Sequence, residues 1–313
     1  MFKFNLVSQN VNLDFLKVKN FAFLFSIALI ILTVFFILYK GLNFGIDFKG
    51  GVLIELRDKS NSSVQLSEFR KKAELLNVGE ISVQKFGKET DVLLRIQKQQ
   101  GDERKQILLI EKVKNTFEKD FEIRRTEFVG PVVGDELKEA GLTAVILSLF
   151  LIMLYIWFRF EWQFAIASII ALIHDVVSTI GLFSIFSLEF NLSIVAAILT
   201  TAGYSINDTV VVFDRVRENL RKYKSKEHYF IYNKSINETL SRTLMTSVTT
   251  LIALVIIYFF GGAVLADFAL AMIWGVIIGT YSSIFIAVSF LTFFKIYKGE
   301  KKENSKHIPE YER

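Results

Sequence analysis

Long runs of apolar residues, separated by shorter polar segments, set the pattern of this chain. Six such runs lie near 21–39, 140–158, 163–187, 190–213, 243–262 and 266–294. Each is long enough for a helix that crosses a bilayer, which needs about 20 mostly apolar residues. The pattern therefore predicts a mainly α-helical membrane protein with six transmembrane helices, the first at 21–40 and the other five within 139–295.

The segment between the first two runs has the pattern of a soluble domain. Apolar and β-branched residues predict strands, and apolar residues at helical spacing predict helices. The strands are expected at 51–56, 81–86, 91–97 and 122–130, and the helices at 62–77 and 102–121. This order is that of a ferredoxin-like (βαββαβ) fold. We therefore expect one small external α+β domain at 41–138, including its junctions with the membrane.

Basic residues indicate the orientation, because Lys and Arg in short loops are retained on the cytoplasmic side. They are frequent in the N-terminal segment, in the loop after the fourth run and in the tail, which span 1–20, 214–242 and 296–313. Both termini and the basic loop are therefore expected in the cytoplasm, with the domain at 41–138 on the opposite side. The basic loop is also expected to contact anionic membrane lipid.

The composition excludes several classes of chemistry. The chain has no Cys and only three His, so it has no thiol or disulfide chemistry, and a His-rich metal site is not favoured. It contains no GxxxxGK[ST] sequence, so it has no P-loop for ATP. The net charge of +5 follows from the basic loops, and no nucleic-acid partner is expected. The sequence predicts no cofactor and no enzyme activity, although a site made only of carboxylates stays open.

Polar residues recur at helical spacing inside three of the apolar runs. The stripes comprise Thr200, Tyr204, Asn207, Asp208 and Val211 in the fourth run, Arg242, Thr246, Thr249 and Thr250 in the fifth, and Ser168, Asp175, Ser178 and Thr179 in the third, with His174 adjacent. An ionised side chain at the centre of a membrane helix costs roughly 2.5–3.5 kcal/mol even on insertion scales. We therefore expect these stripes to face the bundle interior or a water-filled cavity.

Two interpretations of the charged residues stay open. In the structural one, Asp208 and Arg242 form a static ion pair between two helices, and Asp175 hydrogen-bonds a neighbouring helix. In the functional one, Asp208 takes up and releases a proton, and Arg242 responds to its charge. Asp208 is expected in the inner third of its helix, close to the level of Arg242, and Asp175 nearer the midplane.

Two glycine-rich segments, 41–51 and 129–137, join the external domain to the membrane. They are expected to be tight or flexible turns. Their candidate hinge or junction residues are Gly41, Gly45, Asp47, Gly50, Gly51, Gly130, Pro131 and Gly134.

Five short sequences occur in a specific order along the chain. They are GIDFKGG, VGPVVGDEL, ALIHDV, GYSINDTVVVFDRVREN and SRTLMTS. Together they resemble the SecF subunits of the bacterial SecDF protein-export complex, which belong to the resistance-nodulation-division (RND) superfamily. The match extends from Gly41 to beyond the fifth predicted helix.

The resemblance implies a function. It suggests a subunit that uses the proton-motive force to assist late stages of Sec-dependent protein export across the bacterial cytoplasmic (inner) membrane. The proton would be the coupling ion, and Asp208, Arg242, Thr246 and Asp175 would form its relay. The implied partners are a SecD-type subunit, the SecYEG translocon, YajC- and YidC-type proteins and a translocating polypeptide.

Two other functions remain as alternatives. A passive scaffold that stabilises the translocon would tolerate replacement of Asp208 and Arg242 together by an apolar pair, whereas a proton carrier would not. Half of a small-molecule RND exporter would usually carry a much larger external domain, and the small size of 41–138 argues against it.

Overall fold

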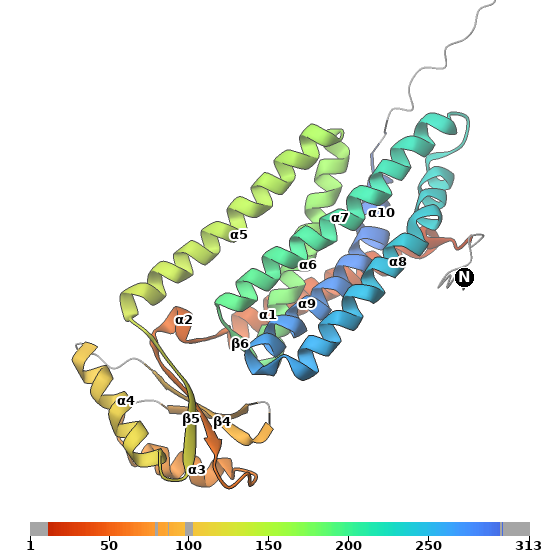
Figure 1. Cartoon of the computed structure of the whole chain (residues 1–313). Helices are drawn as coiled ribbons and strands as arrows, with labels where there is room; N and C mark the ends of the chain where they lie inside the picture. Colours follow the sequence, from red (N-terminus) through yellow and green to blue (C-terminus); the bar gives the residue numbers. More distant parts are fainter. Residues whose placement is uncertain (1–11, 79–80, 87, 98–102, 295, 297–313) are drawn as a thin grey trace, which may run out of the picture.

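The computed structural model of the chain describes residues 12–78, 81–86, 88–97, 103–294 and 296. In this part, long helices form a bundle that carries a small α+β domain at one end (Figure 1). Six helical segments are long and apolar enough to cross a membrane, which confirms the predicted number. They are formed by α1 (Lys19–Lys40), α5 (Pro131–Arg159), α6 (Trp162–Phe186), α7 (Leu192–Lys222), α8 (His228–Phe260) and α9 (Gly262–Ser282), the last continuing through η2 (Ser283–Ala287) and α10 (Val288–Leu291).

The basic segment at 214–242, expected as a cytoplasmic loop, consists largely of helix. Helix α7 continues to Lys222 and α8 begins at His228, so that only 223–227 lies between them. The two helices stabilise each other beyond their apolar parts: Arg215 Nε donates to Glu238 Oε2 at 2.6 Å, and Asn219 Nδ2 donates to the same oxygen at 2.7 Å. A hydropathy pattern misses such extensions because it detects only the apolar part of a helix.

The second glycine-rich junction is largely helical. Helix α5 begins at Pro131 with Gly130 as its N-cap, so the expected turn at 129–137 is wrong beyond Gly130. Proline suits the first helical position because its missing N–H would have no partner there. Gly134 then faces α2 (Ile46–Lys49), where an added Cβ would lie 3.2 Å from the Gly50 nitrogen. The glycine allows the two backbones to pack closely.

The external domain has the predicted order of elements. They are β2 (Gly51–Asp58), α3 (Leu66–Glu74), β3 (Ile81–Phe86), β4 (Lys88–Gln97), α4 (Glu103–Phe117) and β5 (Phe121–Val129). The sheet order is β3-β4-β2-β5, with all neighbours antiparallel. Each pair of strands joined by a helix is therefore separated by one antiparallel strand, which is a split β-α-β arrangement.

The two faces of this sheet have different neighbours. Alternate residues of β2, including Ile54, pack with the helices around Phe69 and Phe117, whose rings stack at 4.5 Å. On the other face, Leu53 and Leu93 pack with Ile46 of α2. The second face thus rests on the junction with the membrane bundle.

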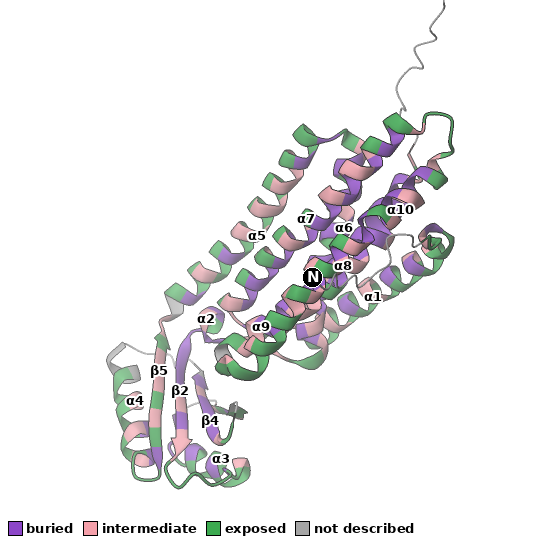
Figure 2. Cartoon of the chain, turned by 45° about the vertical axis from the view of Figure 1, so that its right-hand side comes forward, coloured by how far each residue is buried: buried purple, intermediate pink, exposed green. Residues whose placement is uncertain are grey.

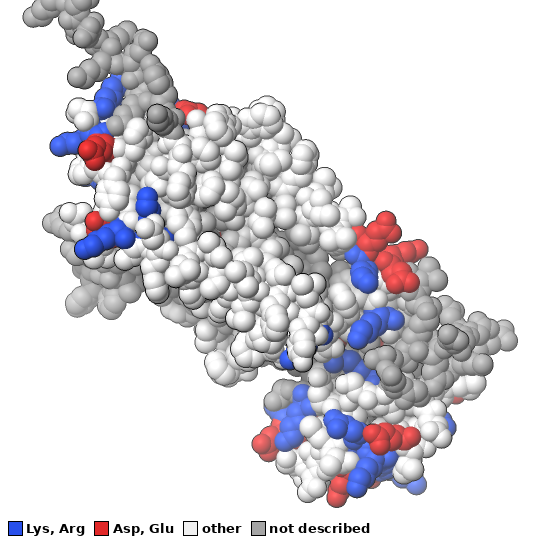
Figure 3. Space-filling view, turned by 180° about the vertical axis from the view of Figure 1, so that it is seen from behind, with Lys and Arg blue, Asp and Glu red and all other residues white. Residues whose placement is uncertain are grey.

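The bundle is covered by apolar side chains over its middle. Figure 2 shows that α1 and α5 expose much of their length, whereas buried residues are frequent along α6, α7 and α9. In Figure 3, a broad band without Lys, Arg, Asp or Glu separates two charged ends of the molecule. A surface of this kind is stable in lipid and not in water. The chain is a multi-pass membrane protein.

Helices α7 and α9 approach each other most closely at small residues. Gly275 of α9 lies against Thr201 of α7, and Gly279 lies against Ser205, whose Cβ would be 3.0 Å from a Cβ added at the glycine. Small residues at these positions let two membrane helices come into close contact. This contact determines which polar groups meet in the bundle.

Candidate functional site

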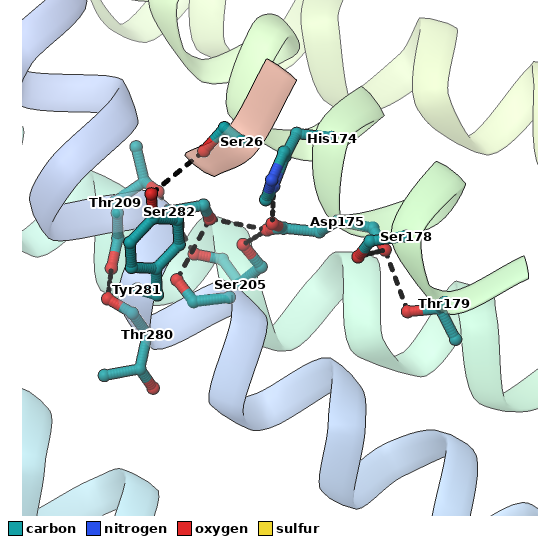
Figure 4. A network of polar contacts seen from close by, with 12 residues as sticks. Ser26, His174, Asp175, Ser178, Thr179, Ser205, Thr209, Thr280, Tyr281 and Ser282 are labelled. Carbon is teal, nitrogen blue, oxygen red and sulfur yellow. Dashed lines mark hydrogen bonds and ion pairs between the residues drawn. The ribbon is translucent and has the colours of Figure 1, made fainter. Parts of the chain in front are cut away.

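Asp175 lies at the centre of a closed hydrogen-bond network (Figure 4). Its side chain is fully buried. Ser205 Oγ of α7 and Ser282 Oγ of α9 donate to its Oδ2 at 2.5 and 2.7 Å. His174 Nδ1, from the preceding residue on α6, lies 3.0 Å from its Oδ1. One carboxyl group thus joins three membrane helices.

The sequence pattern identified Asp175 and His174 but missed both serines. Ser205 does not belong to the stripe assigned to the fourth run, and Ser282 lies in the last run, where no stripe was recognised. The available signal was the GVIIG sequence, because Gly275 and Gly279 bring α9 close to α7. Ser282 also directly precedes the π-helical turn η2, and such turns occur frequently at functional sites.

Tyr281 extends the network towards α1. Its hydroxyl lies 3.0 Å from Ser26 Oγ and donates to the Ala22 carbonyl at 2.8 Å. Its ring centroid lies 6.1 Å from that of His174. His174 Nε2 is buried and has no hydrogen-bond partner among the described residues. The imidazole therefore keeps one nitrogen available inside the bundle.

Asp208 has a different environment. It is 3% exposed, and its Oδ2 has no hydrogen-bond partner in the described part of the chain. Arg242 and Thr246 of α8 are near enough for their charge and hydroxyl group to act on this carboxyl group. Thr246 Oγ1 also donates to carbonyls of its own helix, to Thr243 at 2.9 Å and to Arg242 at 3.2 Å.

The static ion pair between Asp208 and Arg242 is not observed. Among the described residues, these two side chains form no ion pair within 4.0 Å. Asp208 is therefore a buried carboxyl group that has a cation nearby but no direct contact with it. Such a group can change its protonation without first leaving an ion pair.

The three stripes were expected to face the bundle interior or a water-filled cavity, and in this chain they are only partly buried. On α7, Thr200 and Asn207 are exposed, and on α8 Arg242 and Thr249 are exposed. The buried polar residues of α8 are instead Thr239, Thr243, Ser247 and the fully buried Ser235. Periodicity places residues on one face but cannot show whether that face is covered by the same chain. Lipid cannot satisfy these groups, so this exposed polar face of α7 and α8 requires water or another polypeptide.

The first glycine-rich junction is attached to the start of α7. Strand β1 (Asn43–Phe44) pairs in parallel with β6 (Glu189–Phe190), which lies between α6 and α7. Gly45 N donates to the Phe190 carbonyl at 2.9 Å, and Leu192 N, at the first residue of α7, donates to Asp47 Oδ2 at 2.8 Å. The positive φ values of 70° at Gly50 and 138° at Gly51 require glycine where the chain turns into β2. A hinge function for these residues stays a prediction.

A buried ion pair also joins the external domain to the membrane bundle. Arg95 of β4 contacts Glu189 of β6, and their side chains are only 12% and 10% exposed. Burial lowers the pKa of Arg95 to about 10, which the charge of Asp267 on α9 partly opposes. Arg95 therefore remains charged at neutral pH. In the sequence, Glu189 is the only charged residue between the third and fourth apolar runs, and nothing there indicates its partner.

The described residues contain no group of three or more His, Asp and Glu that could hold a metal ion. The chemistry available at this candidate site is that of the Asp175 and Asp208 carboxyl groups, the His174 imidazole and several hydroxyl groups. These groups can bind and transfer protons.

Two family models match the chain. Residues 109–296 match the C-terminal region of the protein export membrane proteins SecD and SecF. Residues 35–57 match the SecD/SecF GG motif. The second match contains the glycine-rich segment that is paired to the start of α7.

Curated relatives match over nearly their whole length. The protein translocase subunit SecF of Rickettsia bellii (strain OSU 85-389) is 45% identical over 303 residues, covering 96% of this chain and 99% of the relative. The subunit of the same name from Rickettsia prowazekii (strain Madrid E) is 43% identical over 304 residues, with 96% and 97% covered.

Two solved structures have the same fold. The crystal structure of SecDF, a translocon-associated membrane protein from Thermus thermophilus, has a TM-score of 0.83 and 35% identity, covering 92% of this chain. SecDF in a super-membrane-facing form has a TM-score of 0.67 and 36% identity, covering 91% of this chain. The present chain spans 39% of each of these solved chains.

Proposed function

We propose, since the chain belongs to the family of SecF protein translocase subunits, that it uses the proton-motive force to assist late stages of protein export. Family membership itself assigns it a role in protein export as a transport subunit. The proposal adds the energy source, the stage, the bacterial inner membrane as location and the orientation with both termini in the cytoplasm. A proton that crosses the membrane supplies roughly 2.3 kcal/mol per 100 mV of potential.

A SecD-type subunit is the proposed direct partner. The exposed polar face formed by Thr200, Asn207, Arg242 and Thr249 supports this, because it needs a cover that lipid cannot provide. The matched SecDF chains are longer than this chain, which spans 39% of each. SecYEG, YajC- and YidC-type proteins and the translocating polypeptide belong to the proposal through family membership alone.

The observation that carries the mechanism is the unpaired oxygen of the buried Asp208, with Arg242 nearby. When Asp208 takes up a proton, it loses its attraction to Arg242. The packing of α7 against α8 then changes, because the attraction between Asp208 and Arg242 no longer holds these two helices together. The proton is the coupling ion, and no other cofactor takes part.

Asp175 provides a second carboxyl group for the same path. Its bond to Ser205 places it one helical turn from Asp208, because Ser205 precedes Asp208 by three residues on α7. Thr246 contributes the hydroxyl group on the α8 side. In this proposal the proton passes between hydroxyl groups and carboxyl groups along one side of α7.

Helix α7 would transmit the change to the external domain. It runs without a break from Leu192 to Lys222, so a displacement near Asp208 moves its first turn as well. That turn is held by Asp47, and Glu189 just before it is paired with Arg95 of the external sheet. The two solved SecDF structures have nearly equal identity to this chain but different TM-scores, which supports a fold with more than one arrangement.

The test is the substitution Asp208→Asn, with the SecD-type partner co-expressed. Asparagine keeps the size and hydrogen-bonding groups but cannot carry the proton. We expect proton flux and precursor export to fall together while the complex still assembles. Asp214→Asn on the same helix is the matched control, because Asp214 is half-exposed and paired with Arg159, and it should leave both activities intact.

Persistence of both activities in Asp208→Asn would exclude the proton relay at this residue. If Asp208 and Arg242 can in addition be replaced together by Leu and Met without loss, the passive scaffold is the better account. An exporter of small molecules is less favoured, because the described part of the external domain is small, with one four-stranded sheet and two helices.

A further inference from the structure

An open pocket lies where α7 passes the turn between α5 and α6. This place is at the end of the bundle opposite the external domain (Figure 1). The pocket has a volume of about 520 Å³. The described residues that line it are all charged: Arg159, Asp214, Arg217, Glu218, Arg221 and Lys222. It is separate from the candidate proton site.

The two acids of this pocket are already paired. Arg159 Nη2 donates to Asp214 Oδ1 at 3.1 Å. Glu218 Oε2 accepts from Arg215 Nη1 at 2.6 Å, and Arg215 does not line the pocket. Their negative charges are therefore largely neutralised before any ligand is considered.

Three cations remain in excess. Arg217 Nη1 lies 4.0 Å from Asp214 Oδ1, whereas Arg159 Nη2 lies closer to the same oxygen, at 3.1 Å. Arg221 follows Arg217 by four residues on the same face of α7 and forms no ion pair within 4.0 Å among the described residues. Lys222 has its ammonium over the Tyr223 ring at 5.3 Å. Such a pocket attracts an anion with several acceptor oxygens.

The pocket opens at the level of the lipid headgroups. Arg217 Nη1 donates to the carbonyl of Arg159, the last residue of α5, at 3.3 Å. Two membrane helices meet at this turn, so it marks the boundary of the apolar layer. Trp157 and Trp162 beside it are 60% and 52% exposed, and tryptophan is enriched at membrane interfaces.

We propose that this pocket binds the phosphate group of an anionic phospholipid, such as phosphatidylglycerol. The guanidinium groups of Arg217 and Arg221 can each give two parallel hydrogen bonds to phosphate oxygens. Trp157 and Trp162, on either side of the α5–α6 turn, are exposed, and tryptophan is enriched where membrane helices meet the lipid interface. A lipid matches both features, whereas a free phosphate ion matches only the first.

The experiment uses the tryptophans beside the pocket as probes. The chain has three Trp, and Trp274→Phe leaves Trp157 and Trp162 as the only ones. The full chain is placed in vesicles that contain either phosphatidylglycerol or phosphatidylcholine with bromine near the headgroup, at equal mole fraction. We expect stronger quenching by the anionic lipid. The double substitution Arg217→Gln with Arg221→Gln should lower this preference about 25-fold, because each basic residue contributes about fivefold.

The matched control removes two charges at the same end of the bundle, with Lys17→Gln and Lys224→Gln. It should keep the preference for the anionic lipid. If Arg217→Gln with Arg221→Gln keeps it as well, the proposal is wrong and the attraction is a general surface effect. If inorganic phosphate in the buffer displaces the brominated phosphatidylglycerol, the pocket is a site for free phosphate and the lipid proposal fails. In gel filtration, the variants should elute at the same volume as the parent protein, which establishes that they are folded.

Discussion

The two halves of α7 differ in how their polar groups are satisfied. In the first half, the helix start is capped by Asp47, the preceding Glu189 is paired with Arg95, and Ser205 donates to Asp175. In the second half, Asp208 Oδ2 has no partner in the described part of the chain, although Arg215 and Asn219 further along hydrogen-bond Glu238 of α8. One helix therefore combines a fixed half with a buried carboxyl group that can change partners. This is the arrangement expected of an element that transmits a local change of charge.

The largest effect is expected where the fixed half meets the external domain. Arg95→Gln leaves Glu189 buried without its partner, and breaking a buried ion pair costs about 3–5 kcal/mol. The free energy of unfolding in detergent, measured by denaturant titration, should therefore fall by about 3–5 kcal/mol. Exchange of the two residues, Arg95→Glu with Glu189→Arg, should recover part of it.

The control for this pair is Lys72→Gln, which removes an exposed contact with Asp120. A loss below about 1 kcal/mol is expected there. If Arg95→Gln is no more destabilising than this control, the external domain is not fixed to α7 through Arg95.

A second effect should separate the two membrane carboxyl groups. Asp175→Leu leaves the buried hydroxyl group of Ser205 without its acceptor, whereas Ser282 keeps the Gly279 carbonyl at 3.1 Å. An unsatisfied buried group costs about 1–3 kcal/mol. Asp208→Leu removes a group with one unpaired oxygen and should destabilise the fold less. Thermal unfolding of both variants in the same detergent tests this order. Equal losses would mean that Asp208 is as firmly bonded as Asp175.

A smaller effect is expected from the contact that holds the network together. Gly279→Ala places a Cβ 3.0 Å from that of Ser205 and should cost about 1–3 kcal/mol by overpacking. Gly203→Ala on α7 is the matched control, since nothing lies within 4 Å of its added Cβ. It should be neutral or stabilising by up to about 1 kcal/mol. Similar melting temperatures for the two variants would argue against close α7–α9 packing as the support of Asp175.

Sequence patterns predicted the membrane helices and the external domain for a physical reason. Apolar runs and alternation report local burial, and local burial determines these elements. The same patterns identified Asp175 and Asp208, because an acid in an apolar run is conspicuous. They missed Ser205 and Ser282, since serine is common in membrane helices and its role depends on which helices touch.

Two further features could not be predicted because they depend on pairing between distant segments. The contact of Arg95 with Glu189 joins residues from a soluble strand and a short turn, and neither is unusual in its own segment. The polar stripe of α8 was expected to face the bundle interior or a water-filled cavity, and Arg242 and Thr249 are exposed in this chain. A polar stripe in the sequence shows that one face of a helix is polar. Which molecule contacts that face depends on the assembled complex.

The central claim is that the charge of Asp208 is transmitted along α7 to the external domain. The chain has no Cys, so spin labels can be attached at Asn115→Cys on α4 and Lys224→Cys after α7 without a background. The distance distribution between them is measured by pulsed electron paramagnetic resonance in the complex with the SecD-type partner. We predict that Asp208→Asn, which mimics the neutral carboxyl group, shifts this distribution while Asp214→Asn does not. An unchanged distribution in Asp208→Asn would contradict the account.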